Sequence, residues 1–153
     1  MGSRRLLYGK NVTEICLSSG LAMLLLVACS RQPVYPAPQV EGSAVVIDAK
    51  ALNPEMPEFY TYRYRNKNIN FFVVKINGRV LSFLDACANC YPKKLGYRFE
   101  DGHIVCRACN VRYSVSEVEK GFGGCFPIHI QGHLQDGKYL IPISVLEGMA
   151  DKF

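Results

Sequence analysis

The chain has 153 residues, which is room for one domain of ordinary size, and a hydrophobic content of 49% is sufficient for a packed core although Trp is absent. The formal net charge is +5, and residues 1–28 hold three of the 18 basic and one of the 13 acidic residues, so the remainder carries +3. This mild excess, without a basic stripe interleaved with stacking aromatic residues, excludes nucleic acid from the expected partners.

The N-terminal segment has the layout of an export signal. Arg4, Arg5 and Lys10 precede an apolar run over residues 15–28. As a helix this run would span about 21 Å, which is short of the roughly 30 Å hydrocarbon core of a bilayer. A cleaved signal peptide is therefore favoured over an uncleaved membrane helix.

The end of the apolar run, Leu26-Val27-Ala28-Cys29, resembles a bacterial lipobox, in which a small residue precedes the cysteine that becomes lipidated. We predict a lipoprotein signal peptide over residues 1–28 and a lipid anchor at Cys29. The alternatives are a plain export signal cleaved nearby and a membrane helix. Acyl chains on Cys29 would hold the protein at a membrane, since each buried methylene contributes about 0.8 kcal/mol.

The segment after the lipobox differs in composition from the rest of the chain. Residues 29–43 contain Pro33, Pro36 and Pro38 and almost no apolar periodicity. This composition predicts a Pro-rich extended tether. A single folded domain is then expected over residues 44–153.

Alternating apolar and polar residues predict a mainly β domain, small and antiparallel, built from hairpins. Asn77-Gly78 and Asp136-Gly137 are hairpin signals, because both central residues of such turns need positive φ. Ser116 and Ser144, each three residues before a glutamate, predict a single helical turn and a short C-terminal helix over residues 145–150. The expected strands are residues 45–47, 60–65, 69–76, 79–84, 96–99, 103–105, 111–115, 128–130 and 139–143.

The strongest signal is a pair of C-x2-C motifs, Cys87/Cys90 and Cys106/Cys109, separated by fifteen residues. This spacing is typical of a four-thiolate metal site. Two residues between thiols let one tight turn present both sulfurs to one ion, and a second turn, folded back by the intervening hairpin, completes the tetrahedron. The sequence therefore predicts that these four cysteines bind a metal or cofactor in two loops at one end of the β domain.

The spacing leaves the occupant open among zinc, a single iron and a two-iron, two-sulfur cluster. Each would give the site a net negative charge, which backbone N–H groups and nearby cations must offset. Asn110 tolerates the left-handed backbone geometry with which a cysteine loop aims N–H groups at sulfur. The charged residues of this region are mostly basic, which suits an anionic site and equally suits an exposed solubilising face. They are Lys93, Lys94, Arg98, Arg107 and Arg112 against Glu100 and Asp101.

Cys125 is a fifth cysteine in a glycine-flanked loop before Pro127. It is a further candidate metal ligand, a disulfide partner in metal-free protein, or a buried small residue under the loops. Two disulfides with one leftover thiol are the alternative to a metal site as a whole, because exported thiols usually oxidise unless a metal or partner holds them.

The remaining candidates are weaker. His103, His129 and His133 are possible ligands by type alone, and His129 is expected at the surface because it lies in an alternating strand. No Ser-His-Asp, Cys-His or paired-carboxylate arrangement indicates catalytic residues, so an electron carrier or metal-binding protein is favoured over an enzyme. Several aromatic residues are expected to shield the site from water or to pack in the ordinary way. They are Tyr91, Tyr97, Phe99, Phe122 and Phe126.

The stretch over residues 83–97, with Cys106-Arg107-Ala108-Cys109 and Gly123-Gly124-Cys125-Phe126-Pro127, resembles the FtrD-like membrane iron–sulfur protein family. The resemblance covers roughly residues 44–153. It implies a bacterial envelope protein that binds iron–sulfur or another metal and is associated with transport of iron or related metals. A looser similarity, to Rieske-like and rubredoxin-like metal domains, lies in the order of strands and ligand loops. Where Rieske sites have two histidines this chain has cysteines, and all-cysteine ligation should lower the reduction potential.

Two functional hypotheses follow. The first is a lipid-anchored protein on the periplasmic or extracytoplasmic face of the bacterial envelope, in which an iron–sulfur or iron centre passes electrons to redox or metal-transport partners during metal uptake. The second is a non-redox module, held together by structural zinc or disulfides, that serves as a protein-interaction or metal-chaperone subunit.

Overall fold

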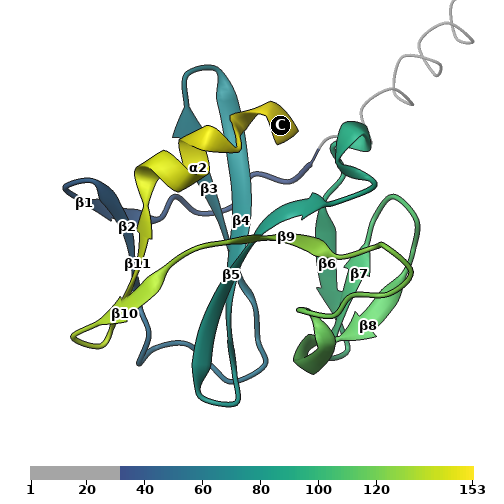
Figure 1. Cartoon of the computed structure of the whole chain (residues 1–153), viewed down its shortest axis with the longest axis horizontal. Coiled ribbons are helices and arrows are strands. Elements are labelled where there is room, and N and C mark those ends of the chain that lie inside the picture. Colours follow the sequence, from purple (N-terminus) through teal and green to yellow (C-terminus); the bar gives the residue numbers. More distant parts are fainter. Residues whose placement is uncertain (1–31) are drawn as a thin grey trace, which may run out of the picture. The chain divides into compact units, whose positions relative to one another are not determined.

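The computed structural model describes residues 32–153, so the predicted signal peptide and Cys29 lie outside the described part of the chain. The described residues form a mainly antiparallel β structure with a short C-terminal helix, as the sequence predicts (Figure 1). Three sheets make up the fold. Among residues 32–153, no helix has the length and apolar character needed to cross a bilayer.

The first sheet has four strands in the order β1-β2-β11-β10, with all neighbours antiparallel. Its two hairpins come from opposite ends of the described chain. The Asp136-Gly137 turn joins β10 to β11 with φ angles of 50° and 79°, which is the predicted hairpin geometry. The strands are β1 (Gln39–Glu41), β2 (Ala44–Asp48), β10 (His133–Gln135) and β11 (Lys138–Pro142).

The second sheet is central and has the order β3-β4-β5-β9. Strands β4 and β5 are joined by the Asn77-Gly78 turn, with φ angles of 50° and 76°, and most residues of these two strands are buried. Burial on both faces of the sheet explains why the sequence of β4 reads as a nearly continuous apolar run. The strands are β3 (Glu58–Tyr64), β4 (Lys67–Ile76), β5 (Arg79–Cys87) and β9 (Pro127–Ile130).

The third sheet is the hairpin predicted between the two cysteine pairs, extended by one strand. It contains β6 (Tyr97–Glu100), β7 (His103–Cys106) and β8 (Arg112–Ser114), in that order. Short helical segments complete the fold. They are the 3-10 turns η2 (Tyr91–Lys93), η3 (Val115–Glu117) and η4 (Ala150–Lys152) and the helix α2 (Ile143–Gly148).

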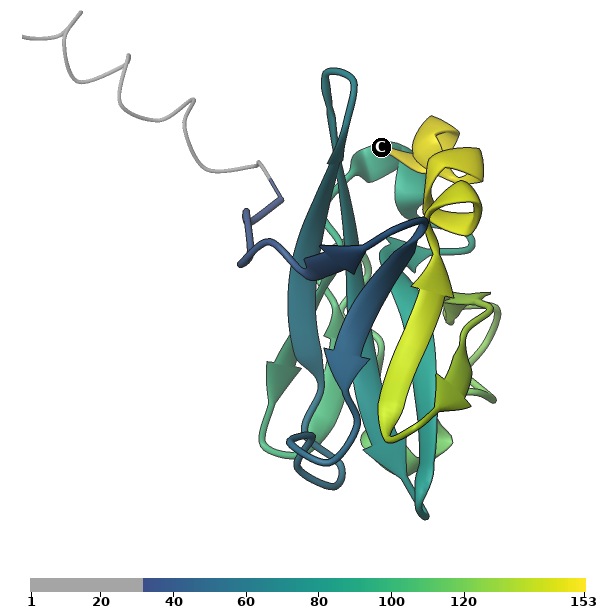
Figure 2. The ribbon, with the colours of Figure 1, turned by 90° about the vertical axis from the view of Figure 1, so that its left-hand side faces the viewer.

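Alternate residues of β4 point into two different cores. Phe71 and Val73 pack with residues of β2, β11 and α2 in the first core, between the first and central sheets. Phe72 and Val74 pack with residues of β5 and the third sheet in the second core. The central sheet is therefore the shared middle layer, with the first sheet on one side and the third sheet on the other (Figure 1). In Figure 2 the first sheet faces the viewer, with β2 and β11 in front. Each fully buried Phe or Val stabilises the fold by about 1.5–3 kcal/mol through lost water contact.

Part of the segment expected as a tether is folded onto the domain. Residues Gln39–Glu41 form β1, and the amide of Asn70 donates a hydrogen bond of 2.7 Å to the Pro33 carbonyl. The backbone N–H of Tyr35 donates to Thr61 Oγ1 at 2.8 Å. These contacts are made by a three-residue strand and by single polar groups, which leave no periodic signal in the sequence.

The helical segments begin earlier than the serine-glutamate spacing predicts. The 3-10 turn η3 follows Ser114, whose hydroxyl donates to Glu117 Oε2 at 3.1 Å, whereas Glu119 pairs with Arg79. Helix α2 begins at Ile143 directly after Pro142, so Ser144 lies inside its first turn instead of capping it. Proline suits that position because its fixed φ matches helix entry and it needs no N–H partner.

Candidate metal centre

The ends of two strands bring the cysteine pairs together. Cys87 is the last residue of β5 and Cys106 is the last residue of β7, and both side chains lie in the second core. The register between β5 and β9 shifts between Phe83 and Cys87, so β5 bulges just before the first cysteine. The bulge re-aims the end of the strand toward the third sheet, where the second pair lies.

The first cysteine loop continues from Cys87 into the 3-10 turn η2. The carbonyl of Cys90 accepts a hydrogen bond from Lys93 N at 3.0 Å, and Lys94 then takes a left-handed conformation with φ of 51°. The N–H of Ala88 donates to the Phe126 carbonyl at 2.9 Å. This bond fixes the first loop against the loop that carries Cys125.

The second cysteine loop is a tight turn closed by its own backbone. Asn110 N donates to the Cys106 carbonyl at 2.9 Å, and Cys106 N donates to the Val111 carbonyl at 3.0 Å. Asn110 has φ of 58°, as its side-chain type predicted. Arg107 N donates to the Gly96 carbonyl at 3.0 Å, which joins this loop to the start of β6.

A third loop places Cys125 beside both pairs. Phe122 and Cys125 exchange two backbone hydrogen bonds of 3.0 and 2.8 Å around Gly123 and Gly124. Both glycines have positive φ, 55° and 81°, which a two-residue hairpin turn of this kind requires. The turn directs the Cys125 side chain inward, where it is 5% exposed.

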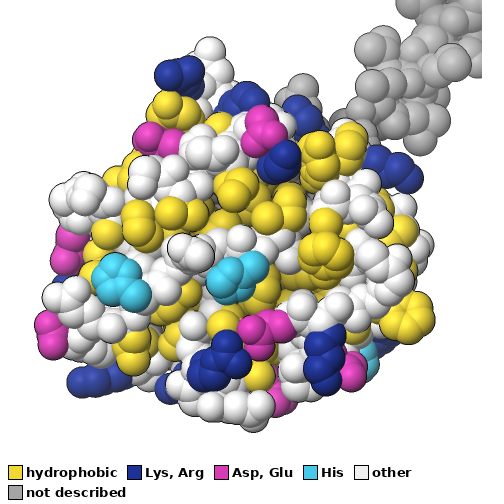
Figure 3. Space-filling model, in the orientation of Figure 1, with side chains coloured by type: hydrophobic (Ala, Val, Ile, Leu, Met, Phe, Trp, Pro, Cys, Tyr) yellow, Lys and Arg dark blue, Asp and Glu magenta, His cyan; other side chains and the backbone are white. Residues whose placement is uncertain are grey.

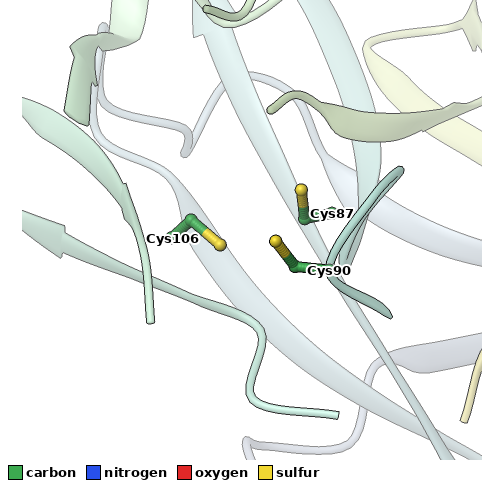
Figure 4. Close-up of side chains that lie close together, drawn as sticks. All are labelled: Cys87, Cys90 and Cys106. Carbon is green, nitrogen blue, oxygen red and sulfur yellow. The ribbon is translucent and has the colours of Figure 1, made fainter. Parts of the chain in front are cut away.

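The five sulfurs converge at one end of the second core. The sulfurs of Cys87, Cys90 and Cys106 all lie within 4.8 Å of one another, and Figure 4 shows these three side chains pointing into a common space. A second group within the same limit contains Cys106, Cys109 and Cys125. Sulfurs bound to one tetrahedral ion at about 2.3 Å stand about 3.8 Å apart. The observed spacing is therefore close to what a thiolate-bound metal needs.

Backbone N–H groups are directed at the thiols, as an anionic site requires. Burial acts to raise the pKa of the Cys87 thiol, but the Tyr97 hydroxyl and the N–H groups of Asn89 and Cys90 lower it to about 7. Burial also acts against ionisation of Cys109, yet the Val111 N–H and the neighbouring thiols lower its pKa. Two of the sulfurs are thus prepared to carry negative charge.

The other three thiols resist ionisation in the absence of a cation. Burial and the adjacent Cys87 thiol raise the pKa of Cys90 to about 12. Burial also raises the pKa of Cys106 and of Cys125, with further contributions from neighbouring sulfurs. Five thiols this close cannot all be negative unless a cation lies among them. The donor set, soft sulfur with N–H support, fits zinc, iron or an iron–sulfur cluster.

One edge of the sulfur cluster reaches the surface. Cys109 is exposed and Cys90 is half-buried, whereas Cys87, Cys106 and Cys125 are buried. Phe122 and Phe126, which were expected either to shield the site or to pack in the ordinary way, are 69% and 41% exposed. Apolar side chains are spread over the middle of the face seen in Figure 3, with most charged side chains toward its margins.

Asp85 is a site residue that the sequence analysis missed. Its carboxylate is 1% exposed in the β5 bulge and accepts hydrogen bonds from Tyr97 N, from Gln32 Nε2 at 2.9 Å and from the Tyr35 hydroxyl at 3.3 Å. Burial raises the pKa of this carboxyl to about 6, although the Gln32 amide, the Tyr97 N–H and Arg107 favour its charged form. The sequence did contain a signal for this residue, because Asp85 is the single acidic residue in the apolar run before Cys87.

The histidines lie apart from the sulfurs. His129 is exposed, as predicted, and its ring packs edge-on against Phe83 at 5.3 Å. His103 Nδ1 lies 2.6 Å from the Asp101 carbonyl. Within residues 32–153, the groups of side chains spaced to hold a metal contain cysteines alone. The predicted ligands Cys87, Cys90, Cys106 and Cys109 are thus brought together with Cys125, and metal binding by them stays a prediction.

Comparison with known proteins adds one match. A family described as FtrD-like, membrane iron-sulfur containing protein, matches residues 52–153. That range contains all five clustered cysteines and all three strands of the third sheet. No curated protein and no solved structure matches the chain, and the likeness to Rieske domains has no support beyond the sequence.

Proposed function

Because the chain belongs to the FtrD-like family of membrane iron–sulfur containing proteins, we propose that it is a lipid-anchored envelope protein whose iron–sulfur or iron centre passes electrons during metal uptake. The observation that carries the proposal is the convergence of five sulfurs from three loops at one end of the second core. Convergence of this kind is costly for thiols alone and is stabilising when a cation is bound.

Some of the sulfurs are buried and one is exposed, and this arrangement supports electron transfer over storage of a metal ion. Cys87 and Cys106 lie on strand ends in a packed core, so a centre held there would change little in shape when its charge changes. Cys109 is exposed, which brings one side of the centre within reach of a docked partner. When bound, iron supplies the one-electron chemistry; the protein holds the ligands and directs N–H groups at sulfur.

The test is the metal content and redox behaviour of the full chain, purified anaerobically in detergent. We expect about stoichiometric iron by elemental analysis, visible charge-transfer absorption and an EPR signal in one oxidation state. Colourless protein with stoichiometric zinc would overturn the proposal in favour of the structural module. Metal-free protein without titratable thiols would instead identify a disulfide-held module.

The lipid anchor needs a separate test, because Cys29 lies outside the described residues. We expect cells expressing the wild-type chain to incorporate labelled palmitate into the protein and to retain it in the membrane fraction. Cys29→Ser should abolish both, while Cys16→Ser, within the predicted signal peptide, should abolish neither. Unchanged labelling in Cys29→Ser would contradict the anchor and leave the metal proposal intact.

A further inference from the structure

Two buried tyrosine hydroxyls beside the cysteines have no hydrogen-bond partner. Tyr97 is fully buried and Tyr113 is 5% exposed. Within the described residues, their hydroxyl oxygens are the buried side-chain polar atoms that remain unpaired. Leaving a buried hydroxyl unpaired costs about 1–3 kcal/mol, so a native structure rarely keeps two such groups without a function.

Strand register directs both tyrosines toward the sulfurs. Tyr97 on β6 is the cross-strand partner of Cys106, and Tyr113 on β8 is the partner of Ile104, two residues before Cys106 on β7. Partners across a strand pair point to the same face, as do residues two apart along a strand. The two side chains therefore share the face of the third sheet that packs in the second core. Cys87, at the end of β5 in the central sheet, belongs to the same core.

The two hydroxyls are also neighbours of each other and of a ligand sulfur. Tyr97, Tyr113 and Cys87 are all members of one buried cluster, the second core, and Tyr97 lies directly across the strand pair from Cys106. Within residues 32–153, neither hydroxyl oxygen has a hydrogen-bond partner. Each has a proton to donate and no acceptor that matches it.

We propose that Tyr113 donates its hydroxyl proton to Tyr97, and that Tyr97 donates to the Cys87 sulfur of the bound iron centre, so that the pair raises the reduction potential of that centre. The inference rests on the proposed function. Sulfur bound to iron carries more negative charge than a neutral thiol and is the stronger acceptor. Hydrogen bonds to such sulfurs stabilise the reduced, more negative state, and they are a recognised determinant of iron–sulfur potentials.

The chain offers a matched control. Tyr139 is also buried, at 4% exposure, but its hydroxyl lies 3.0 Å from Ser82 Oγ in the first core, away from the cysteines. Tyr97→Phe, Tyr113→Phe and Tyr139→Phe each remove one hydroxyl and keep the ring. The first two delete unpaired groups, whereas the third breaks a pair.

The experiment measures the reduction potential and iron content of the full-length wild type and these variants, purified anaerobically. Tyr97→Phe should keep full iron and lower the equilibrium constant for reduction about tenfold, which is about 59 mV for a one-electron couple. Tyr113→Phe should lower it less. The double variant should match Tyr97→Phe, because Tyr113 acts through Tyr97. Tyr139→Phe should leave the potential unchanged.

The results distinguish a failure of the tyrosine proposal from a failure of the proposed electron-transfer function. Wild-type protein without redox-active iron would overturn both. Iron-loaded Tyr97→Phe with the wild-type potential would overturn the inference alone, as would equal shifts in Tyr97→Phe and Tyr139→Phe. In D2O, the deuterium shift of the Fe–S stretching bands should be smaller in Tyr97→Phe than in the wild type. An equal shift would show that the Tyr97 hydroxyl does not bind sulfur.

Discussion

The sulfur of Cys125 lies 3.5 Å from the sulfur of Cys87, 38 positions earlier in the chain, and also 3.5 Å from the sulfur of Cys109. A tetrahedral thiolate site needs four sulfurs, so this cluster contains one more than a single ion or small cluster uses. The exposed Cys109 and the buried Cys125 form one group with Cys106, next to the group of Cys87, Cys90 and Cys106, so we expect Cys109 and Cys125 to be alternative fourth ligands.

The first prediction follows from this surplus. Cys125→Ser should keep the metal with near-wild-type spectra, because the two C-x2-C pairs remain complete. Cys109→Ser should also keep metal, with altered charge-transfer bands, because the Cys125 sulfur takes the vacant position. The double variant should lose the metal. Elemental analysis with visible absorption spectroscopy measures all three, and loss of metal from Cys109→Ser alone would show that Cys125 does not substitute.

The second prediction concerns metal removal. Chelation should lower the melting temperature, because a metal that binds only the folded state stabilises it by mass action. The loss of stability should be confined to the part of the fold around the cysteines. Amide hydrogen exchange should quicken in β6, β7 and β8, which pack around the cysteines, and change little in β2 and β11 of the first core. Uniform acceleration across both cores would contradict a site confined to the second core.

The hairpins and the cysteine pairs were predictable because their signals are local. Asn77-Gly78 and Asp136-Gly137 determine their turns through backbone preference alone, and both have the expected positive φ values. The C-x2-C spacing likewise reports a tight turn. The approach of Cys87 to Cys106 was expected from the hairpin between the pairs, since β6 and β7 fold the second pair back.

The contacts of single polar groups and the pairing of distant strands were not predictable from local pattern. The β5 bulge makes Asp85 a hub for Gln32, Tyr35 and Tyr97, which are distant in sequence. The three-residue strand β1 is too short to show periodicity. Cys125 was a candidate ligand because of its glycine-flanked loop, but its approach to Cys87 also depends on β9 pairing with β5, a long-range contact.

The third prediction tests whether the hydrogen bonds accepted by Asp85 stabilise the fold. Asp85→Ala should lower the free energy of unfolding by about 2–3 kcal/mol, because the buried Tyr97 N–H and Gln32 amide lose their acceptor. Asp48→Ala is the control. It removes an exposed carboxylate that accepts from Lys50 N at 2.9 Å, and it should cost less than about 1 kcal/mol. Urea unfolding of the metal-free proteins gives both free energies of unfolding. Equal losses in the two variants would show that the hydrogen bonds of Asp85 add no particular stability.

The fourth prediction compares two glycines that both have positive φ but have different surroundings. Gly78 has φ of 76° with nothing within 4 Å of an added Cβ, whereas Gly96 has φ of 67° and its Cβ would lie 2.5 Å from the Asp85 carboxylate. Gly78→Ala should therefore cost only the backbone strain, roughly 1–2 kcal/mol. Gly96→Ala adds overpacking of about 1–3 kcal/mol in a core that cannot expand freely.

Gly96→Ala should also weaken metal binding, because the Gly96 carbonyl accepts from Arg107 N in the second cysteine loop. The steric part can be isolated by a double-mutant cycle with Asp85→Ala. Removing the carboxylate relieves the clash, so the double variant should be more stable than the sum of the two losses predicts. Urea unfolding measures the cycle. Strict additivity would show that the cost at Gly96 comes from backbone strain and not from the Asp85 contact.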